Sequence, residues 1–258
     1  MLSKERFNKI LNILNVKKAV TVVELVEALN TSESTIRRDL KTLDEMGKLN
    51  RVFGGATALE LDNELMVEEK DVKSKYQLNK KEKIKIASYG AKLIKDKDFV
   101  YIDAGTSTEY MINYITEKGA IFVTNGIEHA KKLSARGFKV FILGGELKSS
   151  TEALVGTEAV MNLNKFNFTK GFFGTNGISE KAGFTTPDVN ESIVKEAAIG
   201  KCRNVYILAD KSKFGKVFSV TFASLNAGTI ITTKLSNSKL KNNLNVVEVE
   251  KDDLYSNI

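Results

Sequence analysis

The segment with the most distinctive chemistry is Asp103–Glu109, which reads Asp-Ala-Gly-Thr-Ser-Thr-Glu and joins a short apolar run to a helix-like stretch. Gly105 lets a ligand approach the backbone closely, and the hydroxyl groups of the next three residues can donate hydrogen bonds. The free amides of a helix start favour an anion. The loop lacks the glycine-lysine ending of a Walker A loop and the glycines of a dinucleotide fingerprint. We interpret it as a phosphate cradle, although an ordinary capped turn would carry the same residues.

Further polar and glycine-rich clusters follow other short apolar runs. Thr124–Gly126, Gly144–Glu146, Gly174–Gly177 and Ala209–Phe214 each come directly after such a run. In open parallel sheets ligands bind beyond the carboxyl ends of the strands, so we expect these clusters to lie beside the phosphate cradle. Their hydroxyls, amides and few carboxylates, together with the amine of Lys213, suit a phosphorylated polyol.

The apolar runs that precede these clusters are short and rich in β-branched and aromatic residues. Helix-like stretches separate several of them, and this alternation predicts an α/β domain with a largely parallel sheet flanked by helices. A capping pattern at Asn79–Glu82 predicts one such helix, with Ile84, Ala87, Ala91 and Ile94 on its apolar face. The predicted strands are Phe99–Ile102, Ala120–Val123, Lys139–Leu143, Gly171–Phe173, Val205–Leu208 and Gly228–Ile231.

A different chemistry is predicted near the N-terminus, where a helix from about Ser32 has one apolar side and one basic side. At roughly 100° per residue, Ile36, Leu40 and Leu43 lie on the same side. The residues on the opposite side are Ser34, Arg37, Arg38 and Lys41. A recognition helix that meets base edges and phosphates has this pattern. An ordinary solvated helix face has it too.

The segments on both sides of this helix favour its interpretation as a recognition helix over that as an ordinary solvated face. Upstream, Ser3–Leu14 and Thr21–Leu29 repeat apolar residues at the spacing of amphipathic helices, and the second begins with a capping-box pattern. Downstream, Lys48–Thr57 holds a glycine pair between two strand-like stretches, which predicts a hairpin. Helices followed by such a hairpin make a winged helix-turn-helix, whose wing would bring Arg51 near DNA phosphates.

These N-terminal residues resemble the DNA-binding domain of the DeoR family of bacterial repressors. The match in order and spacing covers Ser32, Thr35–Leu40, Leu43, Gly47 and Arg51–Ala56. One departure is Phe53, where the family often has a polar residue. The resemblance implies a DNA-binding domain over residues 1–58. Its expected contact residues are Ser32, Ser34, Thr35, Arg37, Arg38, Lys41, Arg51, Gly54 and Gly55.

The chain from about Lys80 onward resembles the DeoR-family sensor domain, which is similar in fold to ribose-5-phosphate isomerase. Gly183–Asp188, followed by Glu191 and Lys195, resembles a further family signature, whereas Lys211 replaces the histidine or serine often found there. The resemblance implies a sugar-phosphate sensor over residues 80–258, after a linker at 59–79. The effector-binding residues that it implies are Asp103, Gly105, Thr106, Ser107, Thr108, Thr124, Asn125, Gly145 and Lys213.

Composition argues against several other classes of protein. The single cysteine, Cys202, excludes an intrachain disulfide, and the single histidine, His129, has no companion ligands for a metal and is expected on a helix surface. No apolar run is long enough to span a bilayer and the first residues are not a signal peptide, so we expect a cytoplasmic protein without metal or cofactor. The formal charge of +7 suits nucleic acid without being specific for it.

The sequence therefore predicts a repressor of a sugar-metabolism operon that a sugar phosphate releases from its operator. Family resemblance suggests fructose 1-phosphate or tagatose 6-phosphate as the effector. A homo-oligomer, either dimer or tetramer, would hold two recognition helices on a palindromic operator. The alternative is a sugar-phosphate isomerase, in which Asp103, Glu146 or Asp210 would act as a base. In that reaction Lys213 would stabilise an enediolate.

Overall fold

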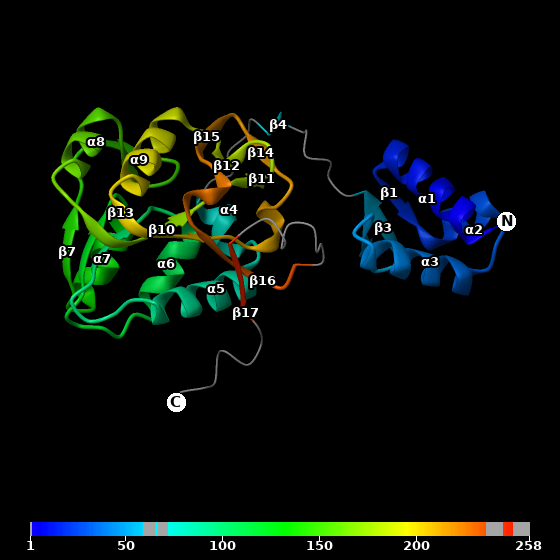
Figure 1. Cartoon of the computed structure of the whole chain (residues 1–258), viewed down its shortest axis with the longest axis horizontal. Coiled ribbons are helices and arrows are strands. Elements are labelled where there is room, and N and C mark those ends of the chain that lie inside the picture. Colours follow the sequence, from blue (N-terminus) through cyan, green and yellow to red (C-terminus); the bar gives the residue numbers. More distant parts are fainter. Residues whose placement is uncertain (1, 59–64, 67–71, 236–244, 250–258) are drawn as a thin grey trace. The chain divides into compact units, whose positions relative to one another are not determined.

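The computed structural model of the chain describes residues 2–58, 65–66, 72–235 and 245–249. Its contacts divide the chain into an N-terminal unit, Met1–Leu61 with Ser236–Asn242, and a C-terminal unit, Asp62–Leu235 with Asn243–Ile258. Figure 1 shows the whole chain, and each unit is described by itself. Parts of the predicted linker and sensor domain lie outside the described residues, namely 59–64, 67–71, 236–244 and 250–258.

The N-terminal unit combines helices with a small antiparallel sheet. Strand β3 lies between β1 and β2 and pairs antiparallel with both. The arrangement confirms the predicted winged helix-turn-helix, because β2, its turn and β3 form the wing after α3. The elements are α1 (Ser3–Lys17), β1 (Ala19–Thr21), α2 (Val22–Leu29), α3 (Glu33–Glu45), β2 (Leu49–Val52) and β3 (Gly55–Ala58).

Polar side chains cap α2 and α3 where the sequence predicts. The hydroxyl of Thr21 accepts a hydrogen bond from the N–H of Glu24 at 3.2 Å, and the Glu24 carboxylate accepts one from the N–H of Thr21 at 2.7 Å. This reciprocal pair satisfies amides that a helix start leaves without partners in the helix. Ser32 accepts a hydrogen bond from the N–H of Thr35 at 3.3 Å. Both helices of the helix-turn-helix therefore begin at residues that fix their ends.

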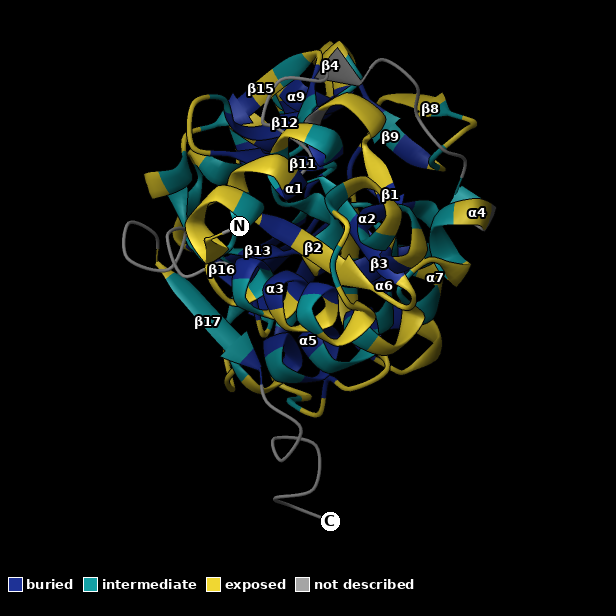
Figure 2. Ribbon diagram, turned by 90° about the vertical axis from the view of Figure 1, so that its right-hand side faces the viewer, coloured by how far each residue is buried: buried dark blue, intermediate teal, exposed yellow. Residues whose placement is uncertain are grey.

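One apolar cluster holds the N-terminal unit together. Helix α3 has a buried side and an exposed side, as the burial colours of Figure 2 show. An ion pair that was not predicted links α1 to α3, because Arg6 donates to the buried carboxylate of Asp39, with 3.0 Å between Nη2 and Oδ1. The buried members of the cluster are Ile10, Leu14, Val20, Val22, Leu25, Ile36, Leu40, Leu43, Leu49 and Ala56.

A seven-stranded parallel sheet forms the centre of the C-terminal unit, with the order β17-β16-β13-β10-β5-β6-β7. The chain runs from β5 outward through β6 to β7, and then returns to the other side of β5 as β10. The strand order therefore reverses between β5 and β10. The strands are β5 (Phe99–Ile102), β6 (Ile121–Thr124), β7 (Lys139–Ile142), β10 (Phe168–Gly174), β13 (Cys202–Leu208), β16 (Thr229–Thr233) and β17 (Val246–Val249).

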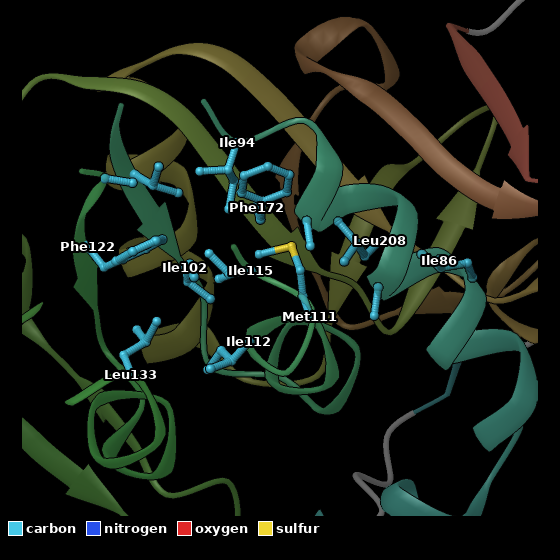
Figure 3. Packing of buried hydrophobic residues seen from close by; sticks show 14 of the residues in the cluster. Ile86, Ile94, Ile102, Met111, Ile112, Ile115, Phe122, Leu133, Phe172 and Leu208 are labelled. Carbon is cyan, nitrogen blue, oxygen red and sulfur yellow. The ribbon is translucent and has the colours of Figure 1, made fainter. Parts of the chain in front are cut away.

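Helices pack against both faces of this sheet, which confirms the predicted α/β architecture. Val100 and Ile102 of β5 join a cluster with residues of α5, α6 and α7, whereas Tyr101 between them joins a cluster with residues of α8 and α9. Figure 3 shows the first cluster, in which Met111 and Phe172 lie among aliphatic side chains. The helices are α4 (Val72–Gln77), α5 (Lys80–Lys92), α6 (Thr106–Ile112), α7 (Ile127–Ala135), α8 (Thr157–Leu163) and α9 (Val189–Ile199).

Shorter elements surround the large sheet. An antiparallel sheet has the order β11-β12-β15, β8 pairs with β9, and β4 pairs with β14. Two 3-10 turns span Lys211–Lys213 and Leu225–Ala227. These short strands are β4 (Leu65–Met66), β8 (Glu146–Lys148), β9 (Ala153–Val155), β11 (Gly177–Ser179), β12 (Gly183–Thr186), β14 (Val217–Phe218) and β15 (Val220–Ala223).

The six predicted strands are all present in the large sheet, but the predicted side-chain cap at Asn79 was wrong and one strand was missed. Asn79 does not cap α5 with its side chain. Its backbone has a φ of 52°, and its side-chain amide donates to the carboxylate of Asp210 at 2.8 Å. The side chain is therefore bonded to a residue distant in sequence and not to the amides of the helix start. Strand β17 was not predicted, since its short Val-Val-Glu-Val run becomes a strand only by pairing with β16.

Candidate functional site

The exposed side of α3 presents the predicted recognition residues. Ser34, Arg37, Arg38 and Lys41 are all exposed there, while Asp39 faces the core. Arg37 donates to Glu33 at 2.8 Å, within an exposed ion pair that water screens. Replacing such an exposed ion pair by a contact to a phosphate costs little free energy. The exposed side of α3 could therefore meet a polyanion without a change in the helix.

Ser32 and Thr35 lie at the start of this helix. Their hydroxyls are 2.8 Å apart, and the Ser32 hydroxyl also lies 3.1 Å from that of Ser34. The predicted contact residues at this end therefore form one hydroxyl cluster at the first turn of α3. In a helix-turn-helix the residues of this turn meet base edges.

The wing is a tight hairpin that backbone contacts hold in place. Gly54 has a φ of 82°, which favours glycine, and its carbonyl accepts a hydrogen bond from the N–H of Val22 at 2.8 Å. A Cβ at Gly55 would collide with the carbonyl oxygen of Val20, so both predicted wing glycines have structural reasons. Arg51 is exposed, while its N–H donates to Asp44 at 3.0 Å. The wing therefore presents Arg51 on a fixed backbone.

A pocket lies in the C-terminal unit where the strand order reverses between β5 and β10. It is lined by Ala104 and Gly105 after β5, by the first residues of α6 (Thr106 and Ser107), and by Gly174–Asn176 at the end of β10. Such switch points are where open α/β sheets bind ligands. Helix α4, within the predicted linker, also lines the pocket with Lys75 and Tyr76. The other polar lining residues are Lys83, Glu109, Glu128, His129, Thr151, Glu152, Glu191, Lys195 and Lys213.

Lysines from four different segments face this pocket. Lys83 of α5 is only 2% exposed, and its ammonium donates to the Thr106 hydroxyl at 2.9 Å and to the carbonyl of Lys75. Burial, and then the nearby charge of Lys213, lower the pKa of Lys83 to about 8. Lys75, Lys195 and Lys213 line the same pocket. An anionic ligand would relieve the repulsion that Lys213 and Lys75 exert on Lys83, and the hydroxyls of Thr106 and Ser107 could donate hydrogen bonds to its oxygens.

The charged floor beneath the loop is an ion pair between Asp103 and Lys195. Both side chains are buried, and Asp103 also accepts a hydrogen bond from the N–H of Gly174 at 3.0 Å. Burial raises the pKa of Asp103, although the ammonium of Lys195 opposes that change. This contact joins the ends of β5 and β10 to α9.

His129 lies inside the protein, so the expectation that it lies on a helix surface was wrong. Its Nε2 is 3.1 Å from both the carbonyl oxygen of Gly105 and the hydroxyl of Thr108. Burial lowers the pKa of His129 to about 4, which leaves the imidazole neutral at pH 7. The neutral ring therefore supports the loop from α7 while it lines the pocket.

Four of the nine predicted effector residues line the pocket, namely Gly105, Thr106, Ser107 and Lys213. Of the other five, Asp103, Thr108, Thr124 and Asn125 lie in or near the loop, whereas Gly145 lies in a separate turn. Asn125 accepts from the N–H of Ala104 at 2.9 Å, Thr108 donates to the carbonyl of Asp103 at 2.6 Å, and Thr124 accepts from the N–H of Gly126 at 3.1 Å. Gly145 has a φ of 137° and belongs to the turn before β8, where a Cβ would lie 2.6 Å from the carbonyl oxygen of Val155.

Several pocket residues were not predicted as ligands. Lys83 lies three, four and seven residues before Ile86, Ala87 and Gly90 on the buried side of α5, so a lysine at an apolar helix position was the available signal. Glu191 and Lys195 belong to the segment that resembles a family signature, and both are buried in α9. Glu191 accepts from Lys148 at 3.1 Å and from Thr151 at 2.7 Å.

Other chemistry has little support in the part of the chain that the structure describes. Its His, Cys, Asp and Glu side chains form no group of three or more that could hold a metal ion. Burial raises the pKa of the Cys202 thiol to about 12, which disfavours the reactive thiolate. Across the described ranges, no helix has the length and apolarity to cross a membrane.

A winged helix-turn-helix with an exposed basic helix, on one chain with an α/β domain, defines the class of DNA-binding transcriptional regulators. The chain belongs to the DeoR family. The model of the DeoR-like helix-turn-helix domain matches residues 6–61, and that of the DeoR C terminal sensor domain matches residues 78–234.

Relatives over nearly the whole chain are similar to it. An uncharacterized HTH-type transcriptional regulator, FruR, of Bacillus subtilis (strain 168) is 42% identical over 234 residues, which cover 90% of this chain and 92% of that protein. The lactose phosphotransferase system repressor of Streptococcus mutans is 31% identical over 236 residues, covering 90% and 92%. Among solved structures, ribose 5-phosphate isomerase A from Methanocaldococcus jannaschii covers 53% of this chain and 55% of its own, with 14% identity and a TM-score of 0.39. That likeness is too low to support a functional argument.

Proposed function

We propose that the protein represses a sugar-metabolism operon and leaves its operator when a sugar phosphate occupies the pocket. The observation that carries the effector half of the proposal is the buried Lys83 on the hydroxyl of Thr106, at a switch point lined by three further lysines. A phosphate would accept from these groups, while the sugar would meet the other polar residues of the pocket. The relatives named as lactose phosphotransferase system repressors support a sugar operon as the target.

The operator-binding half of the proposal uses α3 and the wing. Ser32, Ser34 and Thr35 would meet bases at the start of the helix, and Arg37, Arg38 and Lys41 would bind bases or phosphates further along it. Arg51, Gly54 and Gly55 would place the wing against the backbone. A homo-oligomer would hold two such faces on a palindrome, and ligand would stabilise a conformation that cannot hold both.

We assign the DNA-binding domain to residues 1–58, the linker to 59–79 and the sensor to 80–258. Within the sensor, Gly105, Thr106, Ser107 and Lys213 would contact the effector, whereas Asp103, Thr108, Thr124 and Asn125 would shape the loop. Because a repressor acts where its operator lies, we propose a cytoplasmic location.

The geometry supports a regulator rather than an isomerase. None of the three candidate bases lines the pocket itself, since Asp103 is paired with Lys195 beneath the loop and Glu146 is exposed on β8. Asp210 instead accepts from Asn79 at 2.8 Å and from the N–H of Ser212 at 3.0 Å. Turnover of ribose 5-phosphate by the purified chain would overturn this part of the proposal.

The test begins with the duplex that the full chain binds most tightly from a random-sequence pool. Binding to that duplex is measured with fructose 1-phosphate, tagatose 6-phosphate, the parent sugars and inorganic phosphate. We expect a sugar phosphate to weaken DNA binding at least about tenfold, a coupling in the usual allosteric range, and the parent sugars to leave it unchanged. A response to the unphosphorylated sugars, or to none of the compounds, would contradict the proposed effector class.

Variants separate the two halves of the proposal. Arg38→Ala should weaken binding to the selected duplex by about 1–3 kcal/mol if the side chain meets a base. Thr106→Val and Lys83→Met should keep DNA affinity but lose the response to the sugar phosphate. The matched control is Lys165→Met, which removes an exposed lysine that does not line the pocket. An unchanged response in both pocket variants would reject the pocket as the effector site.

A further inference from the structure

The tip of the wing carries an aromatic side chain that does not belong to the apolar cluster of the N-terminal unit. Phe53 is fully exposed, and Val52 before it is 48% exposed. The apolar cluster of the N-terminal unit includes neither residue. Burying a phenylalanine side chain stabilises a protein, and this residue gains none of that stabilisation in the described N-terminal unit.

The hairpin holds this side chain on a fixed backbone. Val52 pairs with Gly55, which leaves Phe53 and Gly54 as the turn. The carbonyl of Gly54 accepts from the N–H of Val22 at 2.8 Å, and the close approach of Gly55 to Val20 holds the other side of the turn. The ring therefore extends from a narrow turn anchored to the start of α2.

The charges beside the turn suit DNA. Arg51 and Lys48 are exposed on and before β2, and the side of the turn at Gly54 is open, since nothing lies within 4 Å of the position of a Cβ there. Proteins that bind the minor groove combine cationic side chains with apolar wedges inserted between its base steps. The wing offers both, with Lys48 and Arg51 before and on one arm of the hairpin and Phe53 at its tip.

We propose that Phe53 is an apolar wedge that enters the minor groove of the operator and partly unstacks one base step, so that the wing bends the DNA. The proposal rests on the proposed function, because it assumes that the N-terminal unit binds duplex DNA. It gives the wing a role in sequence selection, since flexible pyrimidine–purine steps are unstacked at the lowest cost. The other contacts of the wing position the protein without reading this feature.

The experiment uses the full chain and the duplex selected from the random pool. One set of duplexes carries 2-aminopurine at a single adenine in each, and another carries a donor and an acceptor dye at its two ends. The natural chain should raise 2-aminopurine fluorescence at one step and shorten the end-to-end distance. Phe53→Ala should abolish both signals and weaken binding by about tenfold, the size of one lost base-level contact.

Two further variants keep the proposal falsifiable. Phe53→Leu retains an apolar wedge and should restore most of the distortion, whereas Val16→Ala removes another exposed apolar side chain and should change neither signal. If Phe53→Ala leaves both signals intact, or weakens binding without changing them, the wedge is rejected. If Phe53→Ala changes the oligomeric state in sedimentation while the DNA distortion persists, Phe53 serves a protein contact instead. Failure of the natural chain to bind any duplex would reject the proposed function itself.

Discussion

The two candidate binding surfaces place their charged groups in opposite ways. On α3 the basic side chains lie in water, and exposed partners such as Glu33 screen them. In the C-terminal unit Lys83, Asp103 and Lys195 are almost fully buried around one pocket. A surface that meets a polyanion keeps its charges hydrated until the partner arrives, whereas a pocket for a small anion removes water from them beforehand.

This difference has an energetic consequence. Exposed ion pairs contribute about 0–1 kcal/mol, so a helix face can exchange them for phosphates without loss of stability. Removing one partner of a buried ion pair is strongly destabilising, and buried ionisable groups have shifted pKa values, as Lys83 and His129 do. Substitutions should therefore damage DNA affinity in one unit and stability in the other.

The largest effect is expected from Lys195→Met, which leaves the buried carboxylate of Asp103 without its cation. Breaking a buried pair costs about 3–5 kcal/mol, so the C-terminal unit should lose unfolding free energy of that size. All seven tyrosines lie at or after Tyr76, so the near-ultraviolet tyrosine signal in a urea titration reports this unit alone. The double variant Asp103→Asn/Lys195→Met should be more stable than the single variant, and additive losses would contradict the role of the pair.

The next effect is a loss of stability in acid that depends on His129. Its pKa is about 4 in the folded protein and 6.5 ordinarily, so the unfolded chain binds the proton first as the pH falls. The stabilisation is complete above pH 6.5 and is lost between pH 6.5 and 4, by about 3 kcal/mol at 1.36 kcal/mol per pH unit. Tyrosine-detected unfolding from pH 7 to 4 measures this loss. His129→Gln should show a shallower pH dependence, and an identical slope would contradict the assignment.

A smaller effect concerns the affinity of the pocket for an anion. Because the pKa of Lys83 is about 8, its ammonium loses its proton above that pH and can no longer attract a phosphate. The affinity for the tightest sugar phosphate of the panel should fall by about tenfold from pH 7 to 9. Isothermal titration calorimetry over this range measures the change. Lys83→Met should bind weakly with little pH dependence, and an equally steep fall in that variant would assign the titration to another group.

The smallest stability change is expected from Arg38→Ala on the exposed side of α3. A surface substitution of this kind should alter unfolding free energy by less than about 0.5 kcal/mol, although DNA affinity falls. Hydrogen exchange at the amides of residues 2–58 measures the stability of the N-terminal unit. A loss of several kcal/mol in the unfolding free energy of Arg38→Ala would contradict the idea that exposed basic residues of α3 serve DNA affinity and not stability.

Much of the N-terminal unit could be predicted because its signals are local. The capping residues Thr21 and Ser32 act on amides three residues away, and the apolar residues of α3 repeat with the helix period. The ion pair between Arg6 and Asp39 was missed, since it joins residues 33 apart in the chain. Side-chain charge alone does not say which of several cations a buried carboxylate will meet.

The sequence by itself determined the helices and wing of the N-terminal unit, the alternation of strands and helices after it, and the loop at Asp103–Glu109. Only the tertiary structure decided what surrounds that loop. His129 was expected on a helix surface, but it is buried and contacts the carbonyl of Gly105 in the loop. Lys83, Lys195 and Lys213 belong to separate segments of the chain and line one pocket. The physical reason is that periodicity and capping act over one or two helical turns, whereas desolvation of a charge depends on every segment packed around it.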